Sequence, residues 1–289
     1  MNRREFLLGA LSLEAVPSVA FAKSAADATS GRLRIAHMTD PQLGFSNPKD
    51  PEASYAADLR RFEREIEIVN AMAPDLALIT GDMTHLAEDV ARDWPRLVKM
   101  FKVPLVVAPG NHDIGLNVDK SWRDRYLSVF GYDYKALDVA GWRVIVGNTQ
   151  FWHKTEIKDE QTKYEEWLKA ELETAKSYNG RVVLAGHIPP FADKFYEKDS
   201  YENYPKSGRV ARMKMYLDAG AKFFLAGHTH RMIAHGWREL TILNAETTSR
   251  NFDARPYGFR MFEVADEYDY SYKFVRIGGG SVPATVKQV

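Results

Sequence analysis

Polar side chains that could bind a metal ion or transfer a proton follow a short apolar segment in the middle of the chain. The segment Pro109–Asp113 reads Pro-Gly-Asn-His-Asp and comes directly after Pro104–Ala108. That apolar, β-branched run, bounded by prolines, predicts a buried strand. The polar cluster is therefore expected in the turn where the chain leaves a sheet.

Four other apolar runs end in the same way. Leu33–Thr39, Leu76–Thr80, Arg181–Ala185 and Lys222–Ala226 each run into Asp, Gln or His. In open α/β sheets the loops at the carboxyl ends of the strands converge on one crevice, where ligands bind. We therefore expect one site to collect the side chains of Asp40, Asp82, Asn111, His187, His228 and His230.

These side chains offer carboxylate, amide and imidazole donors, which suit divalent ions such as Mn, Fe and Zn. No single motif proves a metal site, because a lone Gly-Asp or a lone His-x-His is common. Five polar clusters, each at the end of a strand, are hard to explain by turn chemistry or core packing. The sequence therefore favours a metal site.

The elements around these clusters predict a βαβαβ unit followed by further strands and helices. An amphipathic helix over Tyr55–Ala73 ends at Pro74, and a helix over Glu88–Phe101 contains Pro95. Both crossovers are long enough for parallel strands. Later helices are predicted over 119–130, 160–176 and 210–217, and later strands over 132–139, 142–148, 232–236, 240–244, 257–264 and 268–276.

Composition limits the class of partner. The 289 residues are 45% hydrophobic and 27% charged, and 39 Lys plus Arg balance 39 Asp plus Glu. Because no net field favours a polyanion, no nucleic-acid partner is expected. The chain has no cysteine, so neither a disulfide nor a thiolate metal site is possible.

The N-terminus predicts export. Arg3 and Arg4 precede the apolar run Leu8–Val19, and Ala20–Ala22 supplies small residues for a signal peptidase. This pattern resembles a twin-arginine signal, which implies the twin-arginine export machinery as a partner and a periplasmic or otherwise exported bacterial protein. The alternative is an N-terminal amphipathic helix, which Glu14 favours. The run is too short to span a bilayer, so no stable membrane insertion is expected.

Four segments follow from this reading. Residues 1–22 are predicted as a twin-arginine-type signal peptide, 23–32 as a spacer, 33–277 as one domain, and 278–289 as a flexible tail that begins with three glycines.

The ordered motifs resemble those of the calcineurin-like metallophosphoesterases: D-x-H or a variant, GD, GNHD, GH and GHxH, here between Ile35 and His230. The resemblance implies an α/β sandwich of two facing sheets flanked by helices, with two divalent metal ions at its edge. It further implies that Asp82 bridges the two ions and that His112 lies beside the leaving group. The first ion would be held by Asp40, Gln42, Asp82 and His230, and the second by Asp82, Asn111, His187 and His228.

Gln42 departs from the family pattern, which usually has His at this position. An amide oxygen is a weaker donor than imidazole and suits harder ions. The first ion would therefore bind less tightly, or Gln42 would not coordinate. Gln42, with the segments Asn148–Phe151 and His187–Phe191, also resembles a narrower branch of the family that includes a Ser/Thr protein phosphatase. The predicted export signal argues against carrying over that protein's substrate.

The resemblance implies a two-metal-dependent phosphoesterase in which metal-bound hydroxide attacks a phosphate ester. His112 would protonate the leaving group, oriented by Asp113 or another carboxylate, and Asp82 would be essential to both ions. Phosphomonoester hydrolysis is favoured, on a phosphorylated small molecule or a phosphoprotein, because no basic strip marks a nucleic-acid path. The alternatives are a phosphodiesterase or nucleotide pyrophosphatase, and a non-catalytic metal-binding scaffold.

Two segments are expected to choose the substrate. The irregular segment 188–208 contains five aromatic residues that form either a stacking wall or a self-packed surface loop. Arg250 and Arg255 face either an anionic substrate or solvent, and Arg231 could pair with a substrate phosphate. His37 is expected in the core, whereas His85 could touch the site.

Overall fold

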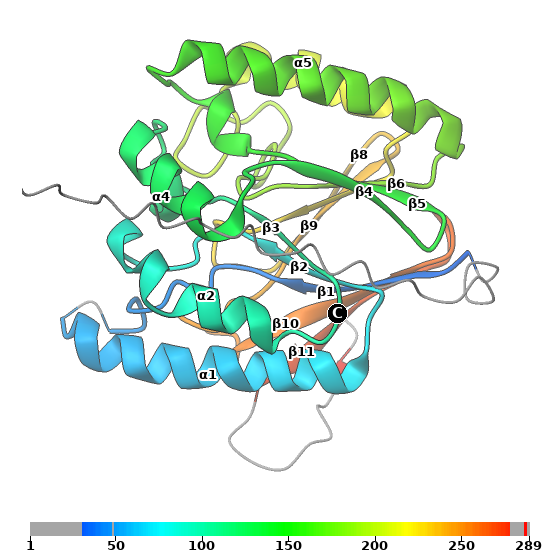
Figure 1. Ribbon diagram of the computed structural model, residues 1–289. Coiled ribbons are helices and arrows are strands. Elements are labelled where there is room, and N and C mark those ends of the chain that lie inside the picture. The colour runs from blue at the N-terminus through cyan, green and yellow to red at the C-terminus, as the bar shows by residue number, and fades with distance from the viewer. Residues whose placement is uncertain (1–30, 48, 278–285, 288–289) are drawn as a thin grey trace, which may run out of the picture.

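The computed structural model describes residues 31–47, 49–277 and 286–287. Two six-stranded sheets lie face to face, with α1 and α2 over the outer face of one and α5 over the other (Figure 1). This confirms the predicted α/β sandwich of two facing sheets. The predicted signal peptide and most of the predicted spacer lie outside the described residues.

The first sheet contains the predicted βαβαβ unit. Its order is β12-β11-β10-β1-β2-β3, with β1, β2 and β3 parallel and β10 antiparallel to β1. The two helices α1 and α2 are the crossovers. The bounds are β1 (Leu33–Met38), α1 (Pro51–Met72), β2 (Leu76–Thr80), α2 (Val90–Met100), β3 (Leu105–Ala108), β10 (Gly258–Val264), β11 (Tyr270–Arg276) and β12 (Val286–Lys287).

The second sheet has the order β4-β5-β6-β7-β9-β8. β5, β6, β7 and β9 are parallel, and β4 and β5, which lie within the strands predicted over 132–139 and 142–148, form an antiparallel hairpin. The bounds are α3 (Asn111–Ile114), α4 (Lys120–Phe130), β4 (Lys135–Val139), β5 (Trp142–Val146), α5 (Lys158–Ala175), β6 (Val182–Ala185), α6 (Lys206–Asp218), β7 (Phe223–Ala226), β8 (Ile233–Trp237) and β9 (Leu240–Asn244).

Helix α1 begins four residues before its predicted start because of its cap. The Asp50 carboxylate accepts a hydrogen bond from the Ala53 N–H, and a proline occupies the first turn, where no N–H partner is needed. Phe62, Ile66 and Val69 are fully buried against the sheet. The helix ends at Ala73, whose left-handed φ of 44° closes it before Pro74.

Alternation along the strands divides the apolar residues between two cores. Ile35 and Leu78 face the second sheet, where they join a cluster with Trp142 and Phe223. Ala36, the neighbour of Ile35, belongs to the cluster under the helices. Because side chains of successive strand residues point to opposite faces, each sheet packs against the other sheet on one face and against helices on the other. This packing on both faces holds the strand ends in position.

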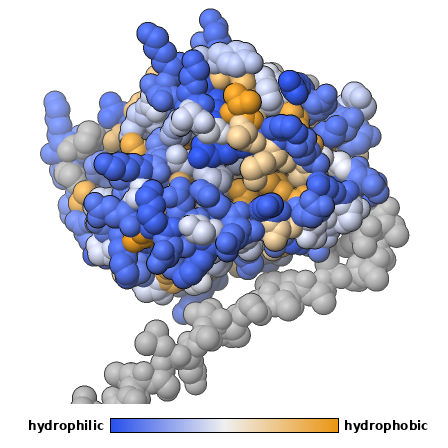
Figure 2. Space-filling model, turned by 90° about the horizontal axis from the view of Figure 1, so that it is seen from above, coloured by the Kyte–Doolittle hydropathy of each residue, from blue (hydrophilic) through white to orange (hydrophobic). Residues whose placement is uncertain are grey.

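Residues 186–205 contain no helix or strand, so the predicted irregular segment 188–208 is confirmed as far as residue 205, whereas 206–208 belong to α6. Within the segment predicted as a flexible tail, Val286 and Lys287 pair with Val275 and Phe274, and the remaining residues lie outside the described part. Among the described helices, none has the length and apolarity needed to cross a bilayer. The face seen from above is largely hydrophilic, with a band of hydrophobic residues (Figure 2).

Candidate metal centre

The carboxyl ends of β1, β2 and β3 in the first sheet meet those of β6 and β7 in the second. Two clusters form there, Asp40 with Asp82 and His230, and Asp82 with His187 and His228. Within each cluster the candidate ligand atoms lie within 4.8 Å of one another. We call Asp40, Gln42 and His230 the first donor group, and Asn111, His187 and His228 the second donor group. Asp82 belongs to both predicted sets, and all seven side chains are buried.

Backbone carbonyls orient the three histidines. His187 Nδ1 donates to Thr80 O at 2.7 Å, and His228 Nε2 donates to Tyr201 O at 2.8 Å. His230 Nδ1 donates to Arg250 O at 2.6 Å. Since a carbonyl only accepts, these nitrogens carry the protons and the opposite ring nitrogens are available to bind a metal.

The available nitrogens face the other donors. His187 Nε2 lies 3.4 Å from Asp82 Oδ1, and His230 Nε2 lies 3.3 Å from Asp40 Oδ1. His228 Nδ1 lies 3.1 Å from His187 Nε2. Hydrogen bonds to the outward ring nitrogen are the usual support of metal-binding histidines.

Two buried oxygens of the first donor group have no hydrogen-bond partner among the described residues: Asp40 Oδ1 and Gln42 Oε1. Asp40 Oδ1 has the ion-pair contact with His230 Nε2 at 3.3 Å, whereas a buried acceptor without any partner, such as Gln42 Oε1, costs about 1–3 kcal/mol. A divalent cation would satisfy both oxygens, and Mn, Fe and Zn all accept carboxylate and imidazole ligands. The residues of the site therefore fit a metal ion.

The second donor group is hydrogen-bonded internally. Asn111 Oδ1 lies 3.0 Å from His187 Nε2, and Asn111 Nδ2 donates to the Tyr201 hydroxyl at 2.6 Å. The Tyr201 hydroxyl thereby fixes the amide with its oxygen toward His187.

Burial and neighbouring charges shift the pKa values of the ligand side chains. Burial alone would lower the pKa of His187, but the Asp82 carboxylate raises it to about 9. Burial opposes ionisation of Asp82, yet His187 and His112 hold its pKa well below the usual range. Burial and the neighbouring His187 lower the pKa of His228 to about 3. Metal binding must displace the His187 proton, so it releases a proton.

Left-handed backbone conformations recur at the predicted ligands. Positive φ angles occur at Asp40 (48°), Gln42 (36°), Asp82 (55°), His228 (71°) and His230 (51°). A residue with a side chain in this region costs about 1–3 kcal/mol, and such strain clusters at functional sites. These strained turns follow β1, β2 and β7, and they aim the side chains after those three strands at one point.

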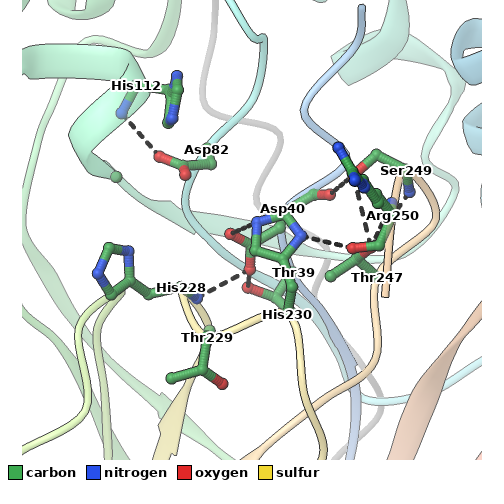
Figure 3. Close-up of polar contacts among 12 residues, drawn as sticks. Thr39, Asp40, Asp82, His112, His228, Thr229, His230, Thr247, Ser249 and Arg250 are labelled. Carbon is green, nitrogen blue, oxygen red and sulfur yellow. Dashed lines mark hydrogen bonds and ion pairs between the residues drawn. The ribbon is translucent and has the colours of Figure 1, made fainter. Parts of the chain in front are cut away.

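Close contacts between loops require glycine at two positions. A Cβ at Gly110 would collide with the Asp82 carboxylate, and a Cβ at Gly227 would collide with Thr39 Oγ1. Because Gly227 has no side chain, the His228 N–H reaches Asp40 Oδ2 at 2.9 Å (Figure 3). The glycines of the GNHD and GHxH motifs thus permit close approach.

His112 is oriented by a different group from the carboxylate that the sequence suggested, and Asp113 has another role. His112 Nδ1 donates to the His85 carbonyl at 2.8 Å, so a backbone carbonyl and not a carboxylate orients the ring. Asp113 instead accepts hydrogen bonds from the backbone N–H groups of Asp82, Met83 and Gly110 at 2.7–2.9 Å. It joins two loops of the site. The His112 N–H donates to Asp82 Oδ1 at 2.8 Å (Figure 3).

The aromatic residues of the segment 188–208 were expected to form either a stacking wall at the site or a self-packed surface loop, and the structure shows some of each. Phe191, Phe195 and Tyr204 are buried, and Phe195 stacks on Trp237 with centroids 4.1 Å apart. Tyr201 is half exposed and lies with its ring centroid 4.5 Å from that of His228. The self-packed loop is therefore the right description for three residues, and Tyr201 borders the site.

Sequence reasoning missed the carbonyl groups of Thr80, His85, Tyr201 and Arg250, which orient the four histidines. A pattern of side chains in the sequence does not reveal which backbone oxygen accepts a hydrogen bond. Only the position of Thr80 at the end of a strand indicated that its carbonyl lies near the site. His37 is buried as predicted, bonded to the hydroxyl groups of Tyr272 and Thr80.

Known proteins are similar to this chain in sequence and in fold. Residues 33–232 match the calcineurin-like phosphoesterase family. The serine/threonine-protein phosphatase CPPED1 of Homo sapiens is 25% identical over 247 residues, covering 79% of each chain. The Danio rerio protein of that name is 26% identical over 220 residues, covering 70% of this chain and 71% of its own.

Two solved structures show the same fold. A dimetal phosphatase from Danio rerio has a TM-score of 0.60 at 13% identity, covering 85% of this chain and 96% of its own. Purple acid phosphatase PPD1 from yellow lupin has a TM-score of 0.59 at 14% identity, covering 89% of this chain and 53% of its own. The chain thus belongs to the calcineurin-like phosphoesterase family, whose members are metal-dependent phosphoric ester hydrolases.

Proposed function

We propose that this protein is an exported phosphoesterase that uses two divalent ions of Mn, Fe or Zn and prefers phosphomonoesters. The observation that carries the proposal is the pair of buried clusters that share Asp82. The partnerless Gln42 Oε1, beside the Asp40–His230 pair, supports a cation in the first cluster.

The residues would divide between two ions as the family resemblance implies. Asp40, Gln42, Asp82 and His230 would hold one ion, and Asp82, Asn111, His187 and His228 would hold the other. Bound there, the ions would activate water and stabilise negative charge on the phosphate. The partnerless Gln42 Oε1 favours coordination by Gln42 over a non-ligand role.

His112 is proposed as the general acid. Its Nδ1 is committed to the His85 carbonyl, so Nε2 is the nitrogen that can deliver a proton to the leaving oxygen. Its backbone N–H is tied to Asp82 Oδ1, which fixes His112 beside the carboxylate shared by both clusters. A non-catalytic scaffold would have no use for this arrangement.

The charges around the site favour a monoester. Arg231 pairs with Glu202, and Arg255 pairs with Glu246 at 3.2 Å. These two cations are therefore neutralised, and among the described residues only Arg250 of the three arginines lacks a carboxylate, which favours a substrate with one phosphate over that of a nucleotide pyrophosphatase. The phosphatase names of the relatives support a phosphorylated small molecule or phosphoprotein as substrate.

The test compares two esters. Metal-stripped protein is re-loaded separately with Mn, Fe and Zn, and hydrolysis of p-nitrophenyl phosphate and bis-p-nitrophenyl phosphate is measured. We expect metal-dependent turnover with the monoester preferred. Preference for the diester would support the phosphodiesterase alternative, and turnover of neither by protein with two bound ions would support the scaffold.

We further propose that the twin-arginine machinery exports the protein and that the mature chain begins near Lys23. The support is the sequence pattern of residues 1–22. N-terminal sequencing of the protein from a periplasmic fraction tests this. Intact Met1 in that fraction would contradict cleavage.

A further inference from the structure

Two phenylalanines border the site at His230, and one of them, Phe45, also approaches His112. Phe45 follows β1, and Phe252 follows β9; their ring centroids lie 6.3 Å apart at 76°. Phe45 also lies 6.4 Å from His112 and 5.4 Å from His230, centroid to centroid. Phe252 stacks on His230 at 4.8 Å and 21°, yet 54% of its surface is exposed. It therefore offers an open aromatic surface beside the site.

Arg250 completes this surface. Its guanidinium carbon lies 5.6 Å from each of the two phenylalanine rings, and the residue is exposed. Within the described part of the chain, no carboxylate pairs with its guanidinium, unlike those of Arg231 and Arg255. Its carbonyl is bonded to His230, so the residue is anchored to the site by its backbone.

The opposite border is different. There the Tyr201 hydroxyl is bonded to Asn111, and Glu202 is paired with Arg231. The groups on that side already have polar partners. Phe45 connects the aromatic surface and the unpaired guanidinium to the proposed general acid, because its ring lies 6.4 Å from His112, 6.3 Å from Phe252 and 5.6 Å from the Arg250 guanidinium carbon.

We propose that Phe45, Arg250 and Phe252 form a leaving-group surface that selects aryl phosphate monoesters. The inference rests on the proposed function, because the leaving oxygen must approach His112 to receive its proton. The aryl ring then extends over Phe252 and beside Arg250, where stacking and cation–π attraction act. Water adds its oxygen to phosphorus, the bond from phosphorus to the aryl oxygen breaks, and the products are a phenol and inorganic phosphate.

The first measurement compares phosphotyrosine with phosphoserine on the metal-loaded protein. We expect Phe252→Ala to raise KM for phosphotyrosine about tenfold, with kcat and the phosphoserine parameters within about twofold. Phe252→Trp should restore the low KM. Tyr268→Ala, which removes a ring that is 89% exposed in the β10–β11 turn, is the matched control and should change neither ester.

The second measurement does not depend on turnover. Binding of phenylphosphonate and methylphosphonate to the metal-loaded protein is measured by calorimetry, and we expect phenylphosphonate to bind about tenfold more tightly. Phe252→Ala should remove that preference. Equal binding of the two phosphonates, or equal losses for both esters, would overturn the leaving-group surface. If neither ester is hydrolysed, the proposed function is wrong. The phosphonate comparison still tests whether the leaving-group surface binds an aryl group.

Discussion

The two donor groups differ in how far their own hydrogen bonds satisfy them. In the second donor group, Asn111 contacts His187, His187 contacts His228, and Tyr201 holds both outer members. In the first donor group, Gln42 Oε1 has no hydrogen-bond partner among the described residues, and Asp40 Oδ1 has only the ion-pair contact with His230 Nε2 at 3.3 Å. The second group is thus satisfied by its own hydrogen bonds, whereas the first leaves the buried Gln42 Oε1 for a cation.

Backbone strain follows the same division. All three members of the first donor group have positive φ, but in the second group only His228 does. Strained backbone and partnerless acceptors both raise the free energy of the folded state. We therefore expect ion binding to stabilise the first donor group more than the second. The four predictions below test or extend this comparison.

The largest effect is expected from Asp82→Asn, because Asp82 serves both donor groups. Each ion contributes several kcal/mol to catalysis, so kcat/KM should fall roughly 10⁴-fold or more. Metal content by mass spectrometry should fall with it. Asp124→Asn, which changes an exposed carboxylate in α4, is the control. An Asp82→Asn variant with two ions and full turnover would refute the shared carboxylate.

His112→Ala should lower kcat by about 100- to 1,000-fold without loss of metal, because His112 belongs to neither donor group. The acid limb of the pH–rate profile should change, since that limb reports proton donation. Metal analysis and kinetics on one preparation check both statements. Loss of the ions in this variant would mean that His112 acts through the metal site.

Gln42 variants separate the two donor groups. Gln42→Ala should lower the bound metal from two equivalents toward one, because only the first donor group loses a ligand. Gln42→His should bind Zn about tenfold more tightly, since imidazole is the better donor. A metal titration monitored by calorimetry measures both the number of bound ions and the affinity for Zn. Two equally tight ions in Gln42→Ala would show that Gln42 is no ligand.

The smallest effect concerns a buried carboxylate outside both donor groups. Burial raises the pKa of Glu65 in α1 to about 8, whereas the site histidines hold the pKa values of Asp40 and Asp82 low. The folded chain therefore keeps a proton that the unfolded chain releases above its ordinary pKa of 4.5. This contribution to stability is complete below that pH and is lost as the pH rises to about 8.

The corresponding experiment measures the free energy of unfolding of wild type and Glu65→Gln at pH 5 and pH 9. Since one pKa unit corresponds to about 1.4 kcal/mol, wild type should lose on the order of a few kcal/mol more than the variant. Parallel pH profiles for the two proteins would contradict a protonated Glu65.

Most of the fold could be predicted from periodicity and turn residues. Apolar runs that end in polar clusters located β1, β2, β3, β6 and β7, and Pro74 located the end of α1. Because these signals are local, they were accurate to within a few residues. The start of α1 was missed because the Asp50 cap precedes the apolar stripe.

For the candidate site, too, one part could be predicted from the sequence and another could not. The sequence by itself determined the types and order of the donor side chains, from Asp40 to His230, because strand ends carry them. Only the tertiary structure decided which nitrogen of each histidine is free, since backbone carbonyls set the tautomers. It also decided that Asp113 joins two loops and that Arg250 alone of three arginines lacks a carboxylate partner among the described residues. Such facts depend on distances between segments far apart in the chain, which no local pattern encodes.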